Sequence, residues 1–266
     1  MLKSLTFALA LIATTVATST SASAITFGTQ DTSSPARFPQ VGALVAEFDG
    51  VKDILCTGTL IASRVFLTAS HCTAFLESIG TDPHDVWVTF DPTFDAASPL
   101  IQGTFHTNPL YASGGQSNTY DVAVVVLDAT PSGITPARLP GPNQLANMSL
   151  KNQRFWAVGY GTVREDKTKG GQTLTFDGIR RYVDQSFRSL TKSWLNLSMN
   201  PSTGSGGTCY GDSGGPHFIG TTNVVAAITV TGDRWCRATD VDYRMDTESA
   251  RSFLGQFVAL PTAAQN

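Results

Sequence analysis

A single serine stands in a run of small and acidic residues towards the carboxyl end of the chain. Ser213 lies in the sequence Gly211-Asp212-Ser213-Gly214-Gly215-Pro216. A serine hydroxyl is a weak nucleophile unless a neighbouring base takes its proton. Small residues on both sides would let a substrate carbonyl approach and would leave backbone N–H groups to face it. The N–H groups of Gly211 and Ser213 are therefore the predicted oxyanion-hole donors, and the chemistry that this run predicts is that of a serine hydrolase.

Two other segments supply the base and the acid that such a serine needs. His71 lies in Leu67-Thr68-Ala69-Ser70-His71-Cys72, and Asp121 precedes the apolar run Val122 to Leu127. Taken alone, each is more often a structural residue than a catalytic one. Together with Ser213 they provide a nucleophile, a base, and an acid that fixes the tautomer of the base and stabilises its cation. We therefore predict a triad of His71, Asp121 and Ser213.

The run around Ser213 also matches G-x-S-x-G, the nucleophile elbow of α/β-hydrolases. That fold places a helix after the serine, and then an acid and a histidine further along the chain. Here the only histidine beyond Ser213 is His217, and Pro216 would interrupt a helix between them. The order His71, Asp121, Ser213 argues against the elbow and agrees with the order found in two-barrel proteases.

The segments that must position these residues have the composition of β-strands. Short runs rich in β-branched and aromatic residues alternate with clusters of Gly, Pro, Asn, Asp and Ser. Many short strands separated by turn residues are typical of an all-β sandwich or barrel. The predicted strands are 41–48, 58–61, 65–68, 86–90, 122–127, 155–158, 179–183 and 224–230. The one predicted helix is capped at Asp246-Thr247-Glu248-Ser249 and continues to Phe257, and the proline-containing stretch 130–150 is the predicted connection between two halves.

Residues 1–24 have the pattern of a secretory signal peptide. Lys3 precedes an uncharged, largely apolar stretch from Leu5 to Ala17, and the small residues Ala22-Ser23-Ala24 close it. The apolar stretch is shorter than the roughly 20 residues that a membrane-spanning helix needs. We therefore expect residues 1–24 to be removed on export, giving a secreted protein, extracellular or periplasmic, with no membrane partner.

All four cysteines lie in the part of the chain that would be exported. An even number in an oxidising compartment favours two disulfides, for which three pairings are open. We favour the sequence-local pairs Cys56–Cys72 and Cys209–Cys236. A zinc site is the competing interpretation, but no cysteine pair has the close spacing usual for zinc ligands.

The charge distribution bears on possible partners. The formal net charge is −3, and no basic run is longer than Arg180-Arg181. Affinity for nucleic acid rests largely on basic contacts to phosphate, so we expect no nucleic-acid partner. The sequence shows no requirement for a metal or another cofactor, and we expect a monomer.

Four motifs together resemble those of chymotrypsin-like (trypsin-like, S1 family) serine peptidases. The motifs are Cys56-Thr57-Gly58-Thr59-Leu60 through Thr68-Ala69-Ser70-His71-Cys72, Asp121-Val122-Ala123, Val158-Gly159-Tyr160-Gly161, and Gly211 to Pro216. The resemblance spans nearly the whole chain after residue 24. It implies two six-stranded antiparallel β-barrels packed together, with the site in the cleft between them, and hydrolysis of peptide bonds in a polypeptide substrate through an acyl-enzyme. The implied halves are 25–135, with the histidine and the aspartate of the triad, and 136–266, with the serine and the terminal helix; both favoured disulfides coincide with pairs usual in the family.

The resemblance also assigns a role to Ile25 and Asp212. In the family a new amino terminus inserts into the protein and pairs with the acid just before the nucleophile, which here is Asp212. Cleavage after Ala24 would itself expose Ile25. We hypothesise that export generates the active form without a separate propeptide; the alternative is that processing continues to a later residue.

The resemblance indicates the primary specificity pocket less clearly. It places the base of the pocket at Gly207, where trypsin-type enzymes have an aspartate, so a strict preference for Lys or Arg is not expected. Asp240 or Asp242 could still place a negative charge there. The remaining predicted pocket residues are Thr208, Thr229, Thr231 and Gly232, of which either of the last two would set the width of the entrance. We predict uncharged, small to medium side chains before the scissile bond.

One departure from the family pattern and one alternative function remain open. Thr229 or Val230 stands where the family often has a serine that hydrogen-bonds the catalytic acid; threonine could serve and valine could not. Chymotrypsin-like folds also serve as catalytically silent binding proteins, because fold alone does not fix function. Such proteins usually lose a triad residue. Since His71, Asp121 and Ser213 are all present, we predict a serine endopeptidase.

Overall fold

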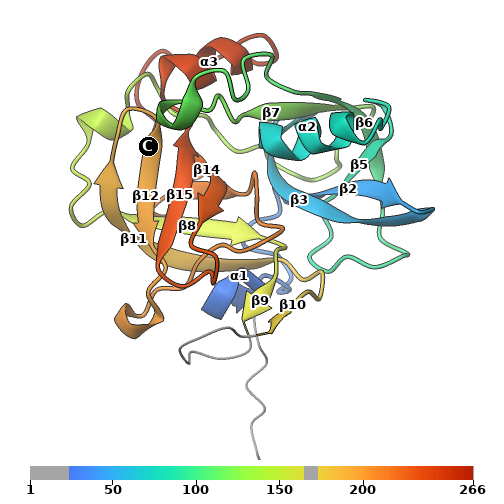
Figure 1. The fold of residues 1–266 in the computed structure, drawn as a ribbon, viewed down its shortest axis with the longest axis horizontal. Coiled ribbons are helices and arrows are strands. Elements are labelled where there is room, and N and C mark those ends of the chain that lie inside the picture. Colours follow the sequence, from blue (N-terminus) through green and yellow to red (C-terminus); the bar gives the residue numbers. More distant parts are fainter. Residues whose placement is uncertain (1–23, 165–172, 266) are drawn as a thin grey trace, which may run out of the picture.

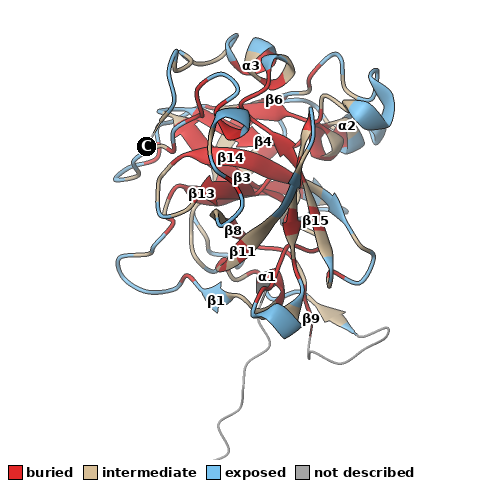
Figure 2. Ribbon diagram, turned by 90° about the vertical axis from the view of Figure 1, so that its left-hand side faces the viewer, coloured by how far each residue is buried: buried red, intermediate tan, exposed pale blue. Residues whose placement is uncertain are grey.

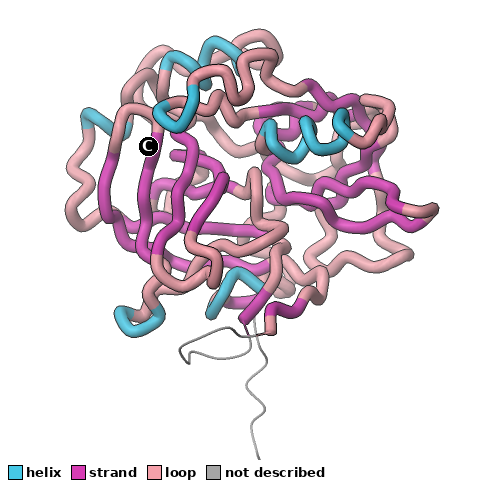
Figure 3. The backbone as a smooth tube through the Cα atoms, in the orientation of Figure 1, coloured by secondary structure: helices cyan, strands magenta, loops and turns pink. Residues whose placement is uncertain are grey.

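The computed structural model describes residues 24–164 and 173–265, so the predicted signal peptide, apart from Ala24, lies outside the described residues. The regular secondary structure of the described chain is mainly β-strand (Figure 3), and the strands build two closed barrels lying side by side (Figure 1). Each barrel in the described part of the chain has six antiparallel strands. The predicted all-β fold with two six-stranded barrels is therefore confirmed.

The first barrel closes in the strand order β2-β3-β4-β7-β6-β5. Its strands are β2 (Val41–Phe48), β3 (Val51–Ala62), β4 (Val65–Thr68), β5 (Val86–Thr89), β6 (Ile101–His106) and β7 (Ala123–Leu127). The β-branched composition of β7 suits a strand that is buried on both faces. The strands β4 and β7 are antiparallel neighbours, with Thr68 opposite Ala123, and this pairing brings the two sequence segments that follow Thr68 and precede Ala123 to the same end of the barrel.

The second barrel closes because β8 pairs with both β11 and β13. Its strands are β8 (Arg154–Gly159), β11 (Arg181–Leu190), β12 (Trp194–Ser198), β13 (Pro216–Ile219), β14 (Val225–Gly232) and β15 (Thr239–Arg244). The short strand β1 (Thr29–Gln30) adds to β11, and β9 (Val163–Arg164) pairs with β10 (Leu174–Thr175) as a separate ribbon. The amino-terminal end of the described chain thus lies against the second barrel.

Helices are few in the described residues. They are α1 (Ala24–Phe27), α2 (Ser70–Ser78) and α3 (Glu248–Leu254), with 3₁₀ turns at Gly115–Ser117, Leu145–Asn147 and Pro201–Thr203. The predicted terminal helix is present as α3, where the Thr247 hydroxyl accepts a hydrogen bond from the Ala250 N–H. The helix α2 was not predicted, because its N-cap residue Ala69 has no side chain that could cap it. None of the described helices is long and apolar enough to span a membrane.

The apolar core runs without interruption from one barrel into the other. One cluster of buried residues joins Phe66 and Val124 of the first barrel to Phe218 and Ile228 of the second. Figure 2 shows this buried interior in red, with exposed residues mainly on loops, on parts of the helices and at the ends of strands. Burial of this shared surface holds the two barrels together.

The buried side chain of Arg180 joins the two barrels through polar contacts. Arg180 Nε donates to Asp31 Oδ2 at 2.9 Å, and the two side chains are 1 % and 0 % exposed. The guanidinium also donates through Nη1 to the carbonyls of Val41 and Phe90, each at 2.9 Å, and to the Tyr160 hydroxyl at 3.1 Å. One cation from the second half thus satisfies two carbonyls of the first barrel.

Replacing Arg180 with methionine is expected to lower the free energy of unfolding by about 3–5 kcal/mol, because it leaves the Asp31 carboxylate buried without its cation. Urea denaturation measures the change. The matched control is Arg154→Met, which breaks a pair with Asp184 whose side chains are 41 % and 34 % exposed and should cost no more than about 1 kcal/mol. Equal losses in the free energy of unfolding for Arg180→Met and Arg154→Met would contradict the larger contribution expected of the buried Arg180 side chain.

Candidate active site

The histidine and aspartate predicted for the triad meet at the end of the first barrel. His71 lies in the first turn of α2, just after β4, and Asp121 lies just before β7. The ring atom Nδ1 of His71 is 2.8 Å from Asp121 Oδ2, and the backbone N–H of His71 donates to Asp121 Oδ1 at 2.9 Å. Because a carboxylate only accepts, Nδ1 carries the proton and Nε2 is left as the basic nitrogen.

Ser70 fixes the two chain segments that carry this pair. Its hydroxyl donates to the Val122 carbonyl at 2.8 Å and accepts from the Asn108 N–H at 3.1 Å. The disulfide Cys56–Cys72 ties β3 to α2 beside His71. These contacts hold the histidine and the aspartate on a rigid part of the barrel, as a catalytic pair requires.

The first barrel also holds the segment that carries Ser213. From β3, the Thr57 N–H donates to the Ser213 carbonyl and the Thr57 hydroxyl donates to the Gly211 carbonyl, both at 2.9 Å. This function of Thr57 was not predicted; the sequence could show it only as part of a family motif. These two hydrogen bonds fix the segment that carries Ser213 against the first barrel.

Two N–H groups beside Ser213 have no acceptor. Within the described residues, the N–H groups of Gly211 and Ser213 donate to nothing, whereas that of Asp212 donates to the Cys209 carbonyl and that of Gly214 to the Thr229 carbonyl. Gly211 has a φ of +95°, a left-handed conformation that favours glycine. The two predicted oxyanion-hole donors therefore lie beside the serine hydroxyl without a hydrogen-bond acceptor among the described residues. This arrangement can stabilise a developing oxyanion.

Ser213 opens onto a small cavity of about 150 Å³. Val230 lines this cavity and also the neighbouring one that His71 and Asp121 line, so the three predicted triad residues surround a common region. The described residues contain no hydrogen bond between His71 and Ser213. Hydrogen bonds between a catalytic base and a nucleophile are often long in proteins without substrate and shorten in the complex with substrate.

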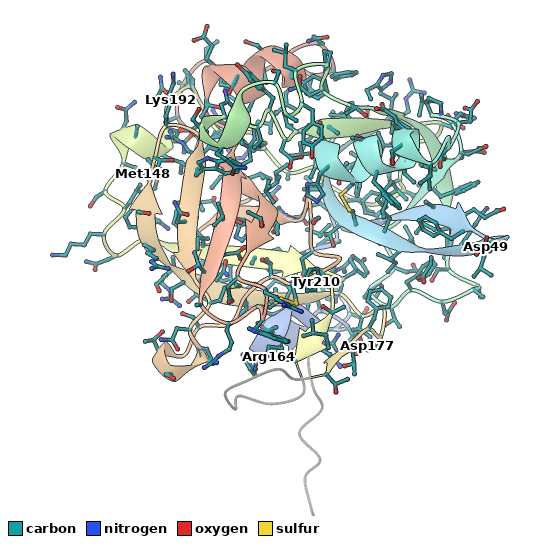
Figure 4. All side chains as sticks on the ribbon, viewed as in Figure 1. Asp49, Met148, Arg164, Asp177, Lys192 and Tyr210 are labelled. Atoms are coloured by element: carbon teal, nitrogen blue, oxygen red, sulfur yellow. A yellow bond between two sulfur atoms is a disulfide. The ribbon has the colours of Figure 1, made fainter. Side chains whose placement is uncertain are left out.

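Four of the residues predicted for the specificity pocket line the cavity beside Ser213. Thr208, Thr229, Thr231 and Gly232 all line it, together with Cys209, Tyr210, Asp233 and Cys236. The disulfide Cys209–Cys236 joins two of its walls. Tyr210 and Trp235 are 57 % and 40 % exposed, and Figure 4 shows Tyr210 near the middle of the molecule. The cavity lining therefore includes one exposed aromatic side chain, that of Tyr210.

Gly207 does not line this cavity. A Cβ at that position would lie 2.1 Å from Met199 Cγ, so Met199, which is fully buried, takes the space that a side chain of residue 207 would need. On its other side Gly207 pairs with Thr26, whose N–H donates to the Gly207 carbonyl at 2.7 Å. The contact between Met199 and Gly207 was not predicted, because no sequence pattern marks a lone methionine as the neighbour of a distant glycine.

Comparisons with known proteins agree with this geometry. The trypsin family model matches residues 28–250. The chain belongs to the trypsin family. Kallikrein-8 of Mus musculus is 26 % identical over 175 residues, which are 64 % of this chain and 64 % of that protein, and kallikrein-8 of Rattus norvegicus is 25 % identical over 196 residues, 72 % of this chain and 71 % of that protein.

Two solved structures show that the fold is shared beyond recognisable sequence identity. A structure of HL collagenase aligns with a TM-score of 0.62 at 18 % identity, covering 86 % of this chain and 95 % of that one. A structure of HBP aligns with a TM-score of 0.64 at 18 % identity, covering 91 % of this chain and all of the other. At such identities the likeness supports the fold of this trypsin-family chain and nothing finer.

The acid before the serine, Asp212, is fully buried. Its carboxylate accepts from the N–H groups of Gly161 and Cys209, each at 2.8 Å. Burial raises the pKa of Asp212 to about 7, although both hydrogen bonds oppose the rise. Ile25 is also fully buried, packed with Ala157 and Val183 of the second barrel. The Ile25 side chain thus already occupies the interior while residue 24 still precedes it.

Behind the pocket wall, three buried ionisable residues form a network. His217 Nε2 lies 2.8 Å from Asp242 Oδ1 and 3.9 Å from Asp240 Oδ2, and all three side chains are 0 % exposed. Asp240 accepts from the Thr208 hydroxyl at 2.5 Å and from Gln185 Nε2 at 2.8 Å. Burial lowers the pKa of His217, but Asp242 and the other nearby acids outweigh it, and the net shift is upward. The two acids considered for the pocket therefore lie behind its wall rather than in it.

The same network explains why no hydroxyl of β14 reaches Asp121 in the described residues. Thr229 Oγ1 is 3.0 Å from His217 Nε2, on the inner side of the strand. A β-bulge between Thr229 and Thr231 leaves Val230 without a partner on β15 and directs it to the cleft that Asp121 lines. Neither residue replaces the serine that the family often has there.

Two groups of side chains come close enough to suggest metal ligands. In the first, Cys56 and Cys72 flank His71, but both sulfurs are used in the disulfide. In the second, formed by His217, Asp240 and Asp242, the imidazole and the Asp240 oxygens are already engaged in the contacts given above. We assign a metal to neither group.

Proposed function

We propose that this chain is a secreted serine endopeptidase in which Ser213 is the nucleophile, His71 the general base and Asp121 the acid that orients the base. Export is supported by the sequence of residues 1–24 and by disulfides, which persist in oxidising compartments. The observation that carries the enzymatic proposal is the pair of unoccupied N–H donors at Gly211 and Ser213, in a protein that also holds His71 against Asp121.

The proposed reaction follows from these positions. His71 Nε2 takes the proton of the Ser213 hydroxyl while its oxygen bonds to the substrate carbonyl carbon, and the oxyanion forms against the N–H groups of Gly211 and Ser213. The C–N bond then breaks as His71 returns the proton to the leaving amine. Water repeats the sequence on the acyl-enzyme, releasing the acid and restoring the serine.

Labelling with a serine-directed phosphonate tests the proposal. Purified protein that begins at Ile25 is expected to take up one equivalent of the reagent at Ser213 and to hydrolyse casein or a mixed peptide library. A folded, correctly processed protein that neither labels nor hydrolyses peptides would support the alternative function, a catalytically silent binding protein.

We propose that the amino group of Ile25, once freed, pairs with the Asp212 carboxylate and thereby forms the active enzyme. Retaining residues 23–24 ahead of Ile25 is expected to abolish most of the activity, since Asp212 then lacks a cation. In that extended form, the rise of the Asp212 pKa from 3.8 to about 7 means that the folded state holds a proton that the unfolded state releases. Its free energy of unfolding should therefore fall as the pH rises from about 4 to 7, by on the order of 4 kcal/mol at most.

Urea denaturation of both forms at pH 4 and pH 7 measures this difference. The form that begins at Ile25 should lose less stability, because its ammonium group favours the ionised Asp212. Asp212→Asn in the extended form is the control and should remove this part of the pH dependence. Equal pH dependence of the two forms, or an active amino terminus downstream of Ile25, would contradict the proposal.

For the substrate, we propose a preference for uncharged, small to medium side chains before the scissile bond. The small cavity supports this, and the acid in its described lining, Asp233, already accepts hydrogen bonds from the N–H groups of Arg237 and Ala238. Cleavage-site sequencing of a peptide library checks it, and a profile dominated by Lys or Arg would overturn it.

A further inference from the structure

The segment between β6 and Asp121 is exposed for much of its length, yet it ends at the proposed catalytic acid. Residues 112–117 are all exposed. Tyr120, the residue before Asp121, has a φ of +52°, a conformation that costs energy for any residue but glycine and persists only where its surroundings impose it. The placement of Asp121 therefore depends on contacts that hold this segment.

Two aromatic residues of the second barrel provide such contacts. The Tyr243 hydroxyl donates to Asn118 Oδ1 at 2.7 Å, and Trp194 Nε1 donates to the Gln116 carbonyl at 3.1 Å. Trp194 and Tyr243 are directly opposite each other on β12 and β15, with ring centroids 5.6 Å apart and planes at 70°. The pair is a preformed, rigid support on one barrel for a loop of the other.

Asn118 links Tyr243 to Tyr120, the residue that precedes Asp121. Its Oδ1, which accepts from Tyr243, also accepts from the Tyr120 N–H at 3.3 Å. The chain of contacts from Tyr243 through Asn118 to Tyr120 thus ends one residue before Asp121.

The acid has few other donors to fix it. Among the described residues, only the N–H and the ring Nδ1 of His71 donate to the Asp121 carboxylate. The hydroxyl of Thr229 is turned to His217, and Val230 has none to offer. The orientation of the carboxylate is therefore set largely by its own backbone.

We infer that Tyr243 and Asn118, with Trp194 beside them, are positioning residues that align Asp121 with His71 from the opposite barrel. This inference rests on the proposed function of Asp121. The hydroxyl of Tyr243 matters through the hydrogen bond to Asn118, and the ring of Tyr243 matters through its packing on Trp194.

Kinetics of Tyr243→Phe test the inference, because this change removes the hydroxyl and keeps the ring. We expect kcat to fall about 10- to 100-fold with KM within about twofold, since a misplacement of 1 Å can cost two orders of magnitude. Asn118→Ala should give a loss at least as large, because it also removes the acceptor for the Tyr120 N–H. The double variant should lose no more than Asn118→Ala alone, because both changes remove the Tyr243–Asn118 hydrogen bond. Asn118→Ala also serves if Tyr243→Phe does not fold.

Ser249→Ala is the matched control. Ser249 Oγ is the other partner of the same Tyr243 hydroxyl, at 2.9 Å, and its removal should leave kcat unchanged. In proton NMR, the resonance of the His71 Nδ1 proton that faces Asp121 should shift or broaden in Tyr243→Phe and Asn118→Ala but not in Ser249→Ala. A purely structural role would lower thermal stability without moving this resonance or separating kcat from KM.

Wild-type kcat in folded Tyr243→Phe, or losses that multiply in the double variant, would overturn the inference while leaving the proposed function intact. Failure of the wild-type protein to label with the phosphonate would instead contradict the proposed function. In that event the NMR comparison still decides whether Tyr243 and Asn118 align Asp121 with His71.

Discussion

Replacing Ser213 with alanine is expected to lower kcat for peptide hydrolysis by about a millionfold, the scale of loss when a triad serine is removed. The variant lacks the hydroxyl that would attack a carbonyl whose oxygen sits on the backbone N–H groups of residues 211 and 213. Activity above water should persist at a low level, because those backbone donors remain in the variant. Initial rates with a peptide that the wild-type protein cleaves measure the loss.

A neighbouring serine gives the control for this substitution. Ser205 precedes the pocket wall on the same stretch of chain, and its buried hydroxyl has no partner among the described residues. Ser205→Ala should leave both kcat and phosphonate labelling unchanged. A folded Ser213→Ala protein that kept more than about a hundredth of the wild-type rate would show that the nucleophile lies elsewhere, because a triad serine contributes several orders of magnitude more.

Asp121→Asn is expected to lower kcat by about 10⁴-fold at neutral pH with little change in stability or KM. The amide is close in shape to the carboxylate, but its NH₂ group can donate to His71 Nδ1. That contact favours the tautomer whose Nε2 carries the proton, and such an imidazole cannot accept the proton of Ser213. The geometry behind this expectation is the 2.8 Å contact between Nδ1 and Oδ2.

Steady-state kinetics of Asp121→Asn should be compared with those of Asp128→Asn. Asp128 follows β7, and its side chain is 51 % exposed, so its replacement should change kcat by less than twofold. In the double variant with Ser213→Ala, the loss should not exceed that of Ser213→Ala alone, because triad residues act as a unit. A loss of less than tenfold for Asp121→Asn would refute its assigned role.

Two strands were predicted with their full bounds, whereas the predicted segments 58–61 and 179–183 cover only part of β3 and β11. The segments 41–48 and 65–68 match β2 and β4 residue for residue. The strands at 101–106, 194–198, 216–219 and 239–244 were not predicted. In β15 the residues Asp240 and Asp242 have the polarity of a loop or an exposed face, and only their burial against His217, Thr208 and Gln185 makes them interior residues.

The sequence by itself determined the chemistry of this protein: Ser213 with flanking glycines, the order of histidine, acid and serine that excludes a nucleophile elbow, and the family to which these motifs belong. These are local properties, since residue type and spacing decide whether a hydroxyl, a base and free N–H groups can exist at all.

Only the tertiary structure decided how these groups are held. Thr57 holds the segment that carries Ser213, and Met199 fills the space beside Gly207. Tyr243 supports the segment that precedes Asp121. Each contact joins residues that are far apart in the chain. Distant contacts of this kind leave no periodic or compositional pattern, because they depend on which barrel surfaces the packing of the apolar core brings together.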